Sequence, residues 1–460
     1  MKELVKKILP PFLLSFYHFI LAFLGAIIYR FPSRSLKVIG VTGTNGKTTV
    51  TEMIAKILEE GGYKVALANS IRFKIGEKVN LNMLKMTMPG RLRIQKFLRE
   101  AVNSGCQYAV LEVTSEGIKQ HRHRFIHFEA AVFTNLSPEH IEAHGGFENY
   151  QKAKGKLFQV CKNIHIINLD DKNADYFLKF PAKKKYLYKF KIQNSKVKSQ
   201  KPSPVSQGEV GFAEQSSSHA LRFTRADEAK PQRPSKVKII NQKLEVLEEV
   251  EIPAINLKLL GEFNISNALA AICVGLSQGI NLDICKKAVE EIEGIPGRME
   301  EVISQPFKVI VDYAFTPNAL EKVYQTIKNS GLICVLGACG GGRDKWKRPV
   351  LGEIAAKYCD KVIVTNEDPY DENPMEIIEQ VAAGAEGKAE KILDRREAIR
   401  KSLQVAKPGD TVIITGKGCE PWICLEGGKK IPWDDRQIVR EEFKNLTGHQ
   451  FQITSIIKKL

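Results

Sequence analysis

The chain has 460 residues, of which 43% are hydrophobic, and a formal net charge of +17. This length predicts about two to four domains, each large enough to bury an apolar core. Nine scattered cysteines with no Cys-x-x-Cys pair argue against a disulfide framework or a zinc ribbon, and they indicate a reducing cytosol. The lysines are spread along the chain without interleaved aromatic residues, so the charge does not predict nucleic-acid binding.

The N-terminal segment is strongly apolar. Between Lys7 and Arg30 no side chain is acidic or basic except His18, and residues 12–29 are just long enough to span a bilayer, which takes about 20 apolar residues. Basic residues flank both ends and no small-residue cleavage site follows, so neither an orientation nor a removed signal peptide is indicated. We expect residues 12–29 to attach the protein to the inner face of the cell membrane. The alternative is an apolar hairpin, broken near Gly25, that packs on the enzyme or on a second subunit.

The most informative pattern follows the next predicted strand, residues 36–41. Residues 42–49 are Thr-Gly-Thr-Asn-Gly-Lys-Thr-Thr, and they lead into a predicted helix over residues 50–58. A glycine-rich turn between a strand and a helix is typical of phosphate-binding loops. The sequence therefore predicts a nucleoside triphosphate site here.

Each polar residue of this loop has an expected task. Gly43 and Gly46 let backbone N–H groups turn towards an anion, Lys47 supplies positive charge, and Thr48 supplies a hydroxyl for Mg²⁺. The strict pattern has a further glycine where this chain has Val41. The residues assigned to the nucleotide are Gly43, Thr44, Asn45, Gly46, Lys47, Thr48 and Thr49.

Beyond the loop, strand and helix patterns alternate, which predicts an α/β fold. A buried strand over 107–112 ends in Glu112, and another follows at 128–133; α/β proteins place their chemistry at such strand ends. From 190 to 236 the composition shifts to Ser, Gln, Lys and Pro, which predicts a loop-rich β insertion.

Helical periodicity returns at 264–278, and a second α/β series begins after Pro296. Its predicted strands are 307–311, 332–336, 361–364 and 411–414. We therefore expect an apolar segment over 1–36, a central ATP-binding domain over 37–296 and a C-terminal Rossmann-like domain over 297–460.

Three further side chains suit metal and phosphate chemistry. Glu112 is placed to hold Mg²⁺ at a strand end. His140 adds a nitrogen ligand, although a histidine taken alone is more often structural. Lys154 shares a helix face with Tyr150, and a lone lysine there would ordinarily be solvated.

The chain resembles the Mur ligases, and most closely the branch that adds the third residue of the muramoyl peptide. The matching stretches occur in the family's order and are 42–49, 112–115, 120–122, 133–140, 144–154, 261–267, 297–300, 312–314, 343–349, 394–396 and 416–420. The resemblance implies a phosphate-loop domain followed by a Rossmann-like ligase domain. It also implies an ATP-dependent acid–amino-acid ligase of peptidoglycan precursor synthesis, which joins a free amino acid to a muramoyl-peptide carboxylate through an acyl phosphate.

The resemblance also implies the nucleotide and metal residues. Lys47 and one Mg²⁺ hold the β- and γ-phosphates, with Thr48 and Glu112 on that metal. A second metal is served by His140 and a carbamylated Lys154. The remaining nucleotide residues are implied as Asn267 at the adenine, with Arg298 and Asp312 at the ribose and phosphates.

The implied substrate residues form two groups. Those on the muramoyl side are Thr87, Pro89, Ser115, Gln120 and Arg122. Those near the incoming amino acid are Arg343, Asp368, Tyr370, Gly416 and Glu420.

The departures from the family concern substrates. Residues 1–36 stand where the family has its N-terminal uridine-binding domain, so the acceptor is either held by the remaining groups or is different, such as a lipid-linked precursor. Diaminopimelate-adding members carry Asp-Asn-Pro-Arg where this chain has Glu367-Asp-Pro-Tyr370. Phe315 and Cys419 replace two family histidines.

These changes predict which amino acid is added. Glu367, Asp368 and Glu420 are three carboxylates with no compensating arginine, so we predict a basic amino acid such as L-lysine or L-ornithine in preference to meso-diaminopimelate. A cation entering from the loop that carries Lys345, Lys347 and Arg348 would reverse that preference.

Two other functions stay open. One is a related amide ligase, such as a folylpolyglutamate synthase or a modifier of lipid-linked precursors. The other is a membrane-tethered ATPase. Residues 120–122 and Glu420 favour the peptidoglycan ligase over a folate enzyme, and Lys154 with the second domain argues against a mere ATPase. A cytoplasmic location is expected in each case.

Overall fold

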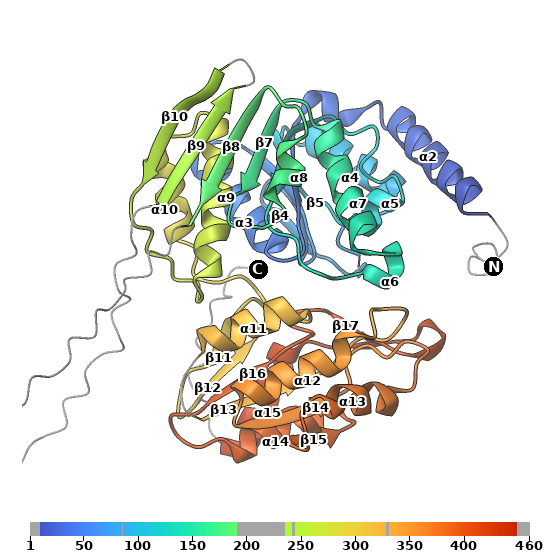
Figure 1. Cartoon of the computed structure of the whole chain (residues 1–460), viewed down its shortest axis with the longest axis vertical. Helices are drawn as coiled ribbons and strands as arrows, with labels where there is room; N and C mark the ends of the chain where they lie inside the picture. Colours follow the sequence, from blue (N-terminus) through green and yellow to red (C-terminus); the bar gives the residue numbers. More distant parts are fainter. Residues whose placement is uncertain (1–9, 85, 191–234, 242–243, 328–330, 449–460) are drawn as a thin grey trace, which may run out of the picture.

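A computed structural model describes residues 10–84, 86–190, 235–241, 244–327 and 331–448. They form two α/β units, which lie one above the other in Figure 1. The upper unit contains a ten-stranded sheet and the lower unit a six-stranded sheet, both with parallel strand pairs at their centres. The predicted fold class is confirmed.

The N-terminal segment forms a single helix, α2 (Pro11–Ile28), which runs through Gly25 without a break. The alternative of a hairpin broken near Gly25 is therefore wrong, although the helix does pack on the enzyme as that alternative proposed. Gly25 instead lies where α2 packs on α4 (Arg91–Asn103), and a Cβ there would lie 3.4 Å from the Arg91 carbonyl oxygen. In the described ranges, no helix has the length and apolar character needed to cross a membrane.

The ten-stranded sheet has the order β10-β9-β8-β7-β6-β1-β5-β2-β3-β4. Its central strand, β1, is buried on both faces, as parallel strands between helical layers are. The strands are β1 (Lys37–Thr42), β2 (Val65–Ala68), β3 (Arg72–Ile75), β4 (Lys78–Leu81), β5 (Tyr108–Glu112), β6 (Phe128–Phe133), β7 (Ile164–Asn168), β8 (Lys184–Lys189), β9 (Ser235–Asn241) and β10 (Leu244–Ile252).

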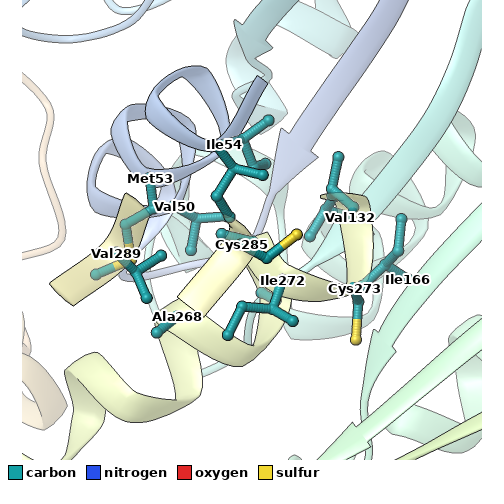
Figure 2. Packing of buried hydrophobic residues seen from close by; sticks show 14 of the residues in the cluster. Val50, Met53, Ile54, Val132, Ile166, Ala268, Ile272, Cys273, Cys285 and Val289 are labelled. Atoms are coloured by element: carbon teal, nitrogen blue, oxygen red, sulfur yellow. The ribbon is translucent and has the colours of Figure 1, made fainter. Parts of the chain in front are cut away.

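Helices cover both faces of this sheet. On one face α3 (Lys47–Glu60), α9 (Phe263–Ser277) and α10 (Leu282–Glu290) form an apolar core with the strands. Figure 2 shows this core, where Ile54 of α3, Ile272 of α9 and Cys285 of α10 meet. The other face carries α4, α5 (Ser115–Lys119), α7 (Phe147–Val160) and α8 (Ala174–Leu178), with η1 (Pro32–Ser35) and α6 (Ile141–His144) at its edges.

The six-stranded sheet has the order β11-β12-β16-β13-β14-β15. Its strands are β11 (Glu300–Ile303), β12 (Lys308–Val311), β13 (Leu332–Leu336), β14 (Lys361–Thr365), β15 (Ala389–Ile392) and β16 (Thr411–Ile414). One face is covered by α11 (Pro317–Thr326), α12 (Lys347–Tyr358) and α13 (Pro374–Ala383), and the other by α14 (Arg395–Val405) and α15 (Asp435–Thr447). A small hairpin of β17 (Trp422–Cys424) and β18 (Lys430–Pro432), with η2 (Glu426–Gly428) between them, completes the unit.

The predicted strands agree closely with this structure. Those at 128–133, 332–336 and 411–414 have the observed bounds, and the others differ by one residue at one or both ends. The helix predicted at 50–58 begins earlier, at Lys47, because Gly46 adopts a left-handed conformation just before it. Residues 191–234 of the predicted β insertion lie outside the described residues. The proposed domain boundary at 296 falls between α10 and β11.

Candidate active site

The phosphate loop joins the end of β1 to the start of α3 and turns at two glycines. Gly43 has a φ of 150° and Gly46 a φ of 81°. A Cβ on Gly43 would lie 1.9 Å from Thr134 Oγ1, and one on Gly46 would lie 2.4 Å from Asn267 Oδ1. Any larger residue would clash at both positions. The loop can therefore turn its N–H groups towards an anion at the N-terminus of α3.

A buried carboxylate closes this loop from the neighbouring strand. Glu112, at the end of β5, accepts a hydrogen bond from Thr48 Oγ1 at 2.9 Å and from Ser70 N at 3.1 Å, both through Oε2. Its Oε1 lies 3.8 Å from Lys47 Nζ, which also donates to Thr44 O at 2.9 Å. A hydroxyl, a carboxylate and an ammonium thus lie together where phosphates and Mg²⁺ would meet. Ser70 was not predicted.

The other loop residues are tied to the strand that follows. The Asn45 N–H donates to Asn135 Oδ1 at 3.0 Å, and Thr44 Oγ1 lies 3.1 Å from the Tyr150 hydroxyl. Thr49 is buried at the start of α3. These contacts tie the phosphate loop to the segment after β6 and to α7.

Lys154 lies on α7, directly behind the phosphate loop. Its side chain is 2% exposed, and its Nζ donates to Gly43 O at 2.7 Å and lies 4.6 Å from the centre of the Tyr150 ring. The alternative of a solvated lysine is therefore wrong. Burial, with the nearby Lys47 charge, holds the pKa of Lys154 well below its usual range, because a charged ammonium is poorly solvated there.

His140 lies in the turn before α6, in a left-handed conformation with a φ of 55°. Burial lowers its pKa to about 2, and the positive charges of Arg343 and Lys347 contribute. Its imidazole is therefore neutral at physiological pH, which is the form that binds metal ions. The ring lies 6.2 Å from that of Tyr150, on which Lys154 also packs.

The predicted ribose and adenine residues come from three different elements. Arg298 Nη2 lies 3.3 Å from Thr48 Oγ1, so a side chain from the junction of the two units reaches the phosphate loop. Asp312, at the end of β12, accepts hydrogen bonds from the N–H groups of Met299 and Ala314 at 2.7 and 2.6 Å. Asn267 is buried against Gly46, as described above. Asp312 thus fixes the chain around Arg298.

One cleft of about 1620 Å³ collects most of these side chains from both units. The predicted residues that line it are Thr44, Asn45, Gly46, Lys47, Thr48, Thr49, Thr87, Glu112, Ser115, Gln120, Arg122, His140, Asn267, Arg298, Asp312, Arg343, Asp368, Tyr370 and Glu420. Four predicted residues, Gly43, Pro89, Lys154 and Gly416, are not part of the lining. Lys154 is instead covered by the loop, and Gly416 lies behind a carboxylate described below.

The muramoyl-side residues form one polar wall of this cleft. Arg122 donates to Met88 O and, through Nη2, to Gln120 Oε1 at 2.8 Å. Thr87 Oγ1 lies 2.8 Å from Ser70 Oγ, the side chain that also contacts Glu112. This wall therefore connects directly to the metal-side carboxylate.

The amino-acid end of the cleft differs from the prediction, because it contains an ammonium. Lys417, fully buried, lies 3.0 Å from Asp368 Oδ2 and 2.6 Å from Glu420 Oε2. Two of the three carboxylates are thus paired, and the expectation of an uncompensated group is wrong. The loop cations do not supply that charge: Lys347 pairs with Glu139, while Lys345 and Arg348 pair with Glu372.

Glu367 is the third carboxylate of this group. It is buried, its Oε1 accepts from Cys339 Sγ at 2.9 Å, and its Oε2 has no hydrogen-bond partner among the described residues. Burial and the adjacent Asp368 raise its pKa. A Cβ on Gly416 would lie 2.4 Å from Glu367 Oε2, so this glycine leaves room for the carboxylate. Glu367 was expected to meet the incoming side chain, whereas Cys339 and Lys417 were not among the predicted site residues.

Comparison with known proteins identifies the family. Residues 41–275 match the Mur ligase middle domain, and residues 297–418 match the Mur ligase glutamate ligase domain. The chain belongs to the Mur ligase family. Mur ligases are ATP-dependent enzymes that form amide bonds and generally use Mg²⁺.

Individual relatives match over most of the chain. It is 39% identical to a UDP-N-acetylmuramoyl-L-alanyl-D-glutamate–2,6-diaminopimelate ligase of Syntrophomonas wolfei, covering 92% of this chain and 81% of that protein. It is 35% identical to a UDP-N-acetylmuramyl-tripeptide synthetase of Roseiflexus, covering 93% and 82%.

Solved structures agree with the sequence relatives. That of a UDP-N-acetylmuramoyl-L-alanyl-D-glutamate–2,6-diaminopimelate ligase superposes with a TM-score of 0.51 at 29% identity, covering 90% of this chain and 79% of that one. A Mycobacterium tuberculosis folylpolyglutamate synthase superposes with a TM-score of 0.62 at 15% identity, covering 94% and 96%; this likeness shows the fold alone.

Proposed function

We propose that this Mur ligase joins a free amino acid to the carboxylate of a muramoyl-peptide precursor at the expense of ATP. The observation that carries the proposal is the single cleft, in which the phosphate loop of one unit faces the paired carboxylates and ammonium of the other. A ligase must bring the γ-phosphate, the acceptor carboxylate and the amine to one place, and this cleft offers a separate wall for each.

The chain's own residues suit each step of acyl transfer. Lys47 and the loop N–H groups would bind the phosphates while the acceptor carboxylate attacks the γ-phosphorus and ADP leaves. Arg122, on the muramoyl wall, would orient the acceptor. The α-amine of the amino acid would then attack the acyl phosphate carbon, lose a proton and expel phosphate. Both steps gather negative charge on oxygens, which preorganised cations and N–H groups stabilise.

Thr48 and Glu112 would hold one Mg²⁺, because a hydroxyl and a carboxylate are the oxygen donors that this ion prefers. When bound there, Mg²⁺ neutralises part of the phosphate charge. We propose a second metal site at His140 and a carbamylated Lys154. Two features support it: the neutral imidazole of His140 and the low pKa of Lys154.

The low pKa matters because only a neutral amine adds to CO₂. The Lys154 nitrogen would form a bond to the carbon of CO₂ and release a proton, giving a carbamate. A buried cation beside Lys47 would thereby become an anion able to bind a metal ion.

The identity of the amino acid remains a proposal. Glu367 has a buried oxygen without a hydrogen-bond partner among the described residues. Tyr370 stands where diaminopimelate-adding members of the family carry an arginine. We therefore propose that a side-chain ammonium, as in L-lysine or L-ornithine, fits better than the added carboxylate of meso-diaminopimelate. The substrates imply a cytoplasmic reaction, and we propose that residues 12–29 attach the enzyme to the inner face of the cell membrane.

The test is phosphate release from ATP by the full chain, with a panel of muramoyl-dipeptide acceptors and amino acids. We expect release that requires both an acceptor and an amino acid. Release that is the same without any acceptor would contradict the ligase and support an ATPase. Release with a folate acceptor alone would support the folylpolyglutamate alternative.

A further inference from the structure

Helix α2 lies at the outer edge of the upper unit and packs on α4 (Figure 1). One side of it is fixed to the protein by specific contacts. Ser15 Oγ lies 2.8 Å from His121 Nε2. The Phe19 ring packs edge-on against the Phe125 ring, with 5.2 Å between the ring centres. Near its C-terminal end, Arg99 Nε donates to Tyr29 O at 3.0 Å. The helix therefore has a defined orientation on the enzyme.

The opposite side of α2 is a continuous apolar surface, which we call the outer face. Phe12 is 69% exposed, and Phe16 and Ile28 are each 61% exposed. Phe12 and Phe16, Leu13 and Tyr17, and Leu24 and Ile28 are each four residues apart, a spacing that places each pair on one side of a helix. The members are Phe12, Leu13, Phe16, Tyr17, Leu24, Ile27 and Ile28, and Phe23 lies at the border, where its ring packs on Phe125. A contiguous apolar surface of this kind on a protein marks an interaction site.

Charge is absent from the outer face and present around it. The only imidazole of α2, His18, points to the protein and accepts from Arg91; burial and that arginine lower its pKa to about 4, so it is neutral at physiological pH. Residues 1–37 contain six lysines and arginines and one acidic residue. Arg93 and Lys96 are exposed on α4, the helix that packs on α2, and Arg30 and Arg34 are exposed just after α2. The apolar surface is thus bordered by cations.

We propose that the outer face of α2 lies in the plane of an anionic lipid bilayer surface, with the surrounding cations at the lipid phosphates. This inference rests on the proposed membrane attachment and gives it a geometry and a lipid class. An apolar helix face with basic borders is the pattern of helices that lie in the membrane interface.

Two alternatives fit the observations less well. A span would require lipid on all sides of α2, but its inner side contacts Arg91, Arg99 and His121 of the folded enzyme. A second copy packed on the outer face would bring basic segments together, because cations lie at both ends of the helix. Anionic lipid would instead neutralise them.

Membrane docking would also orient the cleft. Arg91 of α4 donates from Nε to Gln120 O at 3.1 Å. This contact joins α4 to the segment that carries Gln120 and Arg122. Arg91 also contacts His18 of α2, so one arginine links the lipid-facing helix to the muramoyl wall of the cleft.

The test is flotation of the full chain with vesicles of phosphatidylcholine alone, or of equal parts phosphatidylcholine and phosphatidylglycerol. We expect flotation with the phosphatidylglycerol vesicles only, weakening as salt is added. The double variant Phe16→Glu, Ile27→Glu should lower the partition coefficient at least about tenfold, since two exposed apolar side chains that would enter the bilayer are lost. Ile284→Glu, at an exposed isoleucine of α10, is the matched control and should bind like the wild type.

Thermal melting checks that the double variant folds. Because vesicle binding is measured without substrates, the result does not depend on whether the enzyme is an active ligase. Equal flotation of the wild type and the double variant would overturn it, as would no flotation with either lipid. A wild-type dimer that the double variant converts to monomers, seen by light scattering, would assign the outer face to a second copy instead.

Discussion

The two ends of the active-site cleft are built in different ways. At the phosphate loop, the key groups come from one short stretch of sequence and one strand end, and backbone geometry determines where they lie. At the amino-acid end, Lys417 pairs with Asp368, which is 49 residues away in sequence. The first kind of site is encoded locally. The second depends on which distant side chains the fold happens to bring together.

The largest expected effect is at the local end. Lys47→Ala removes the one ammonium within 4 Å of Glu112 in the described residues. Loss of such a preorganised contact costs about 3–4 kcal/mol in the transition state, so kcat/KM for phosphate release should fall by about 10²–10³-fold. Lys56→Ala, on the exposed side of the same helix, is the control. Near-normal turnover by Lys47→Ala would show that the loop does not bind the triphosphate.

A comparable loss of activity is expected for Lys154→Ala, but a small carboxylic acid should restore part of it. If the carbamate supplies an anionic ligand, a short-chain carboxylic acid can enter the space left by the side chain and replace it. We expect activity to fall by about 10²-fold and to recover in part with added acetate or propionate. Lys152→Ala, exposed on the same helix, should be unaffected. A folded Lys154→Ala that no acid rescues would count against the carbamate.

The sequence was enough to expect that the loop residues and Glu112 lie together, for a physical reason. The backbone conformation and the close contacts at residues 43 and 46 require glycine, and a glycine is directly visible in the sequence. The strands were predicted for a similar reason, since burial on both faces gives continuous apolar runs. Lys417 could not be assigned, because its partner Asp368 lies on a different loop and only the fold joins them. The spacing of Lys417 and Glu420 was the one available signal.

An intermediate effect is expected at the amino-acid end. Lys417→Met leaves Asp368 and Glu420 without their ammonium, which should raise KM for the amino acid about tenfold or more while KM for ATP changes little. Lys345→Met is the control, because that exposed lysine pairs with Glu372 outside this group. An equal rise in both KM values would indicate a general loss of structure.

The same pocket decides the amino acid. With purified wild-type enzyme, kcat/KM should be higher for L-lysine than for meso-diaminopimelate, and Glu367→Gln should narrow that difference several-fold by removing the charge that faces the side-chain ammonium. Direct competition between the two amino acids measures it. A higher kcat/KM with diaminopimelate would show that the pocket accommodates the second carboxylate despite Tyr370.

The smallest effect is expected where the two ends of the cleft are joined. Asp344, buried in the lower unit, accepts hydrogen bonds from the N–H groups of Ile141 and Glu142 at 3.1 and 3.0 Å. These N–H groups directly follow His140, so Asp344 positions that histidine from across the cleft.

Asp344→Asn keeps one acceptor and loses the charge, which should cost about 1 kcal/mol and lower kcat/KM about fivefold. Because the contact links the two units, the substitution should lower kcat/KM and leave the melting temperature nearly unchanged. Asp371→Asn, whose carboxylate accepts from Gly427 N within the lower unit, is the matched control. A drop in melting temperature with unchanged kinetics would mean that Asp344 supports the fold and does not position His140.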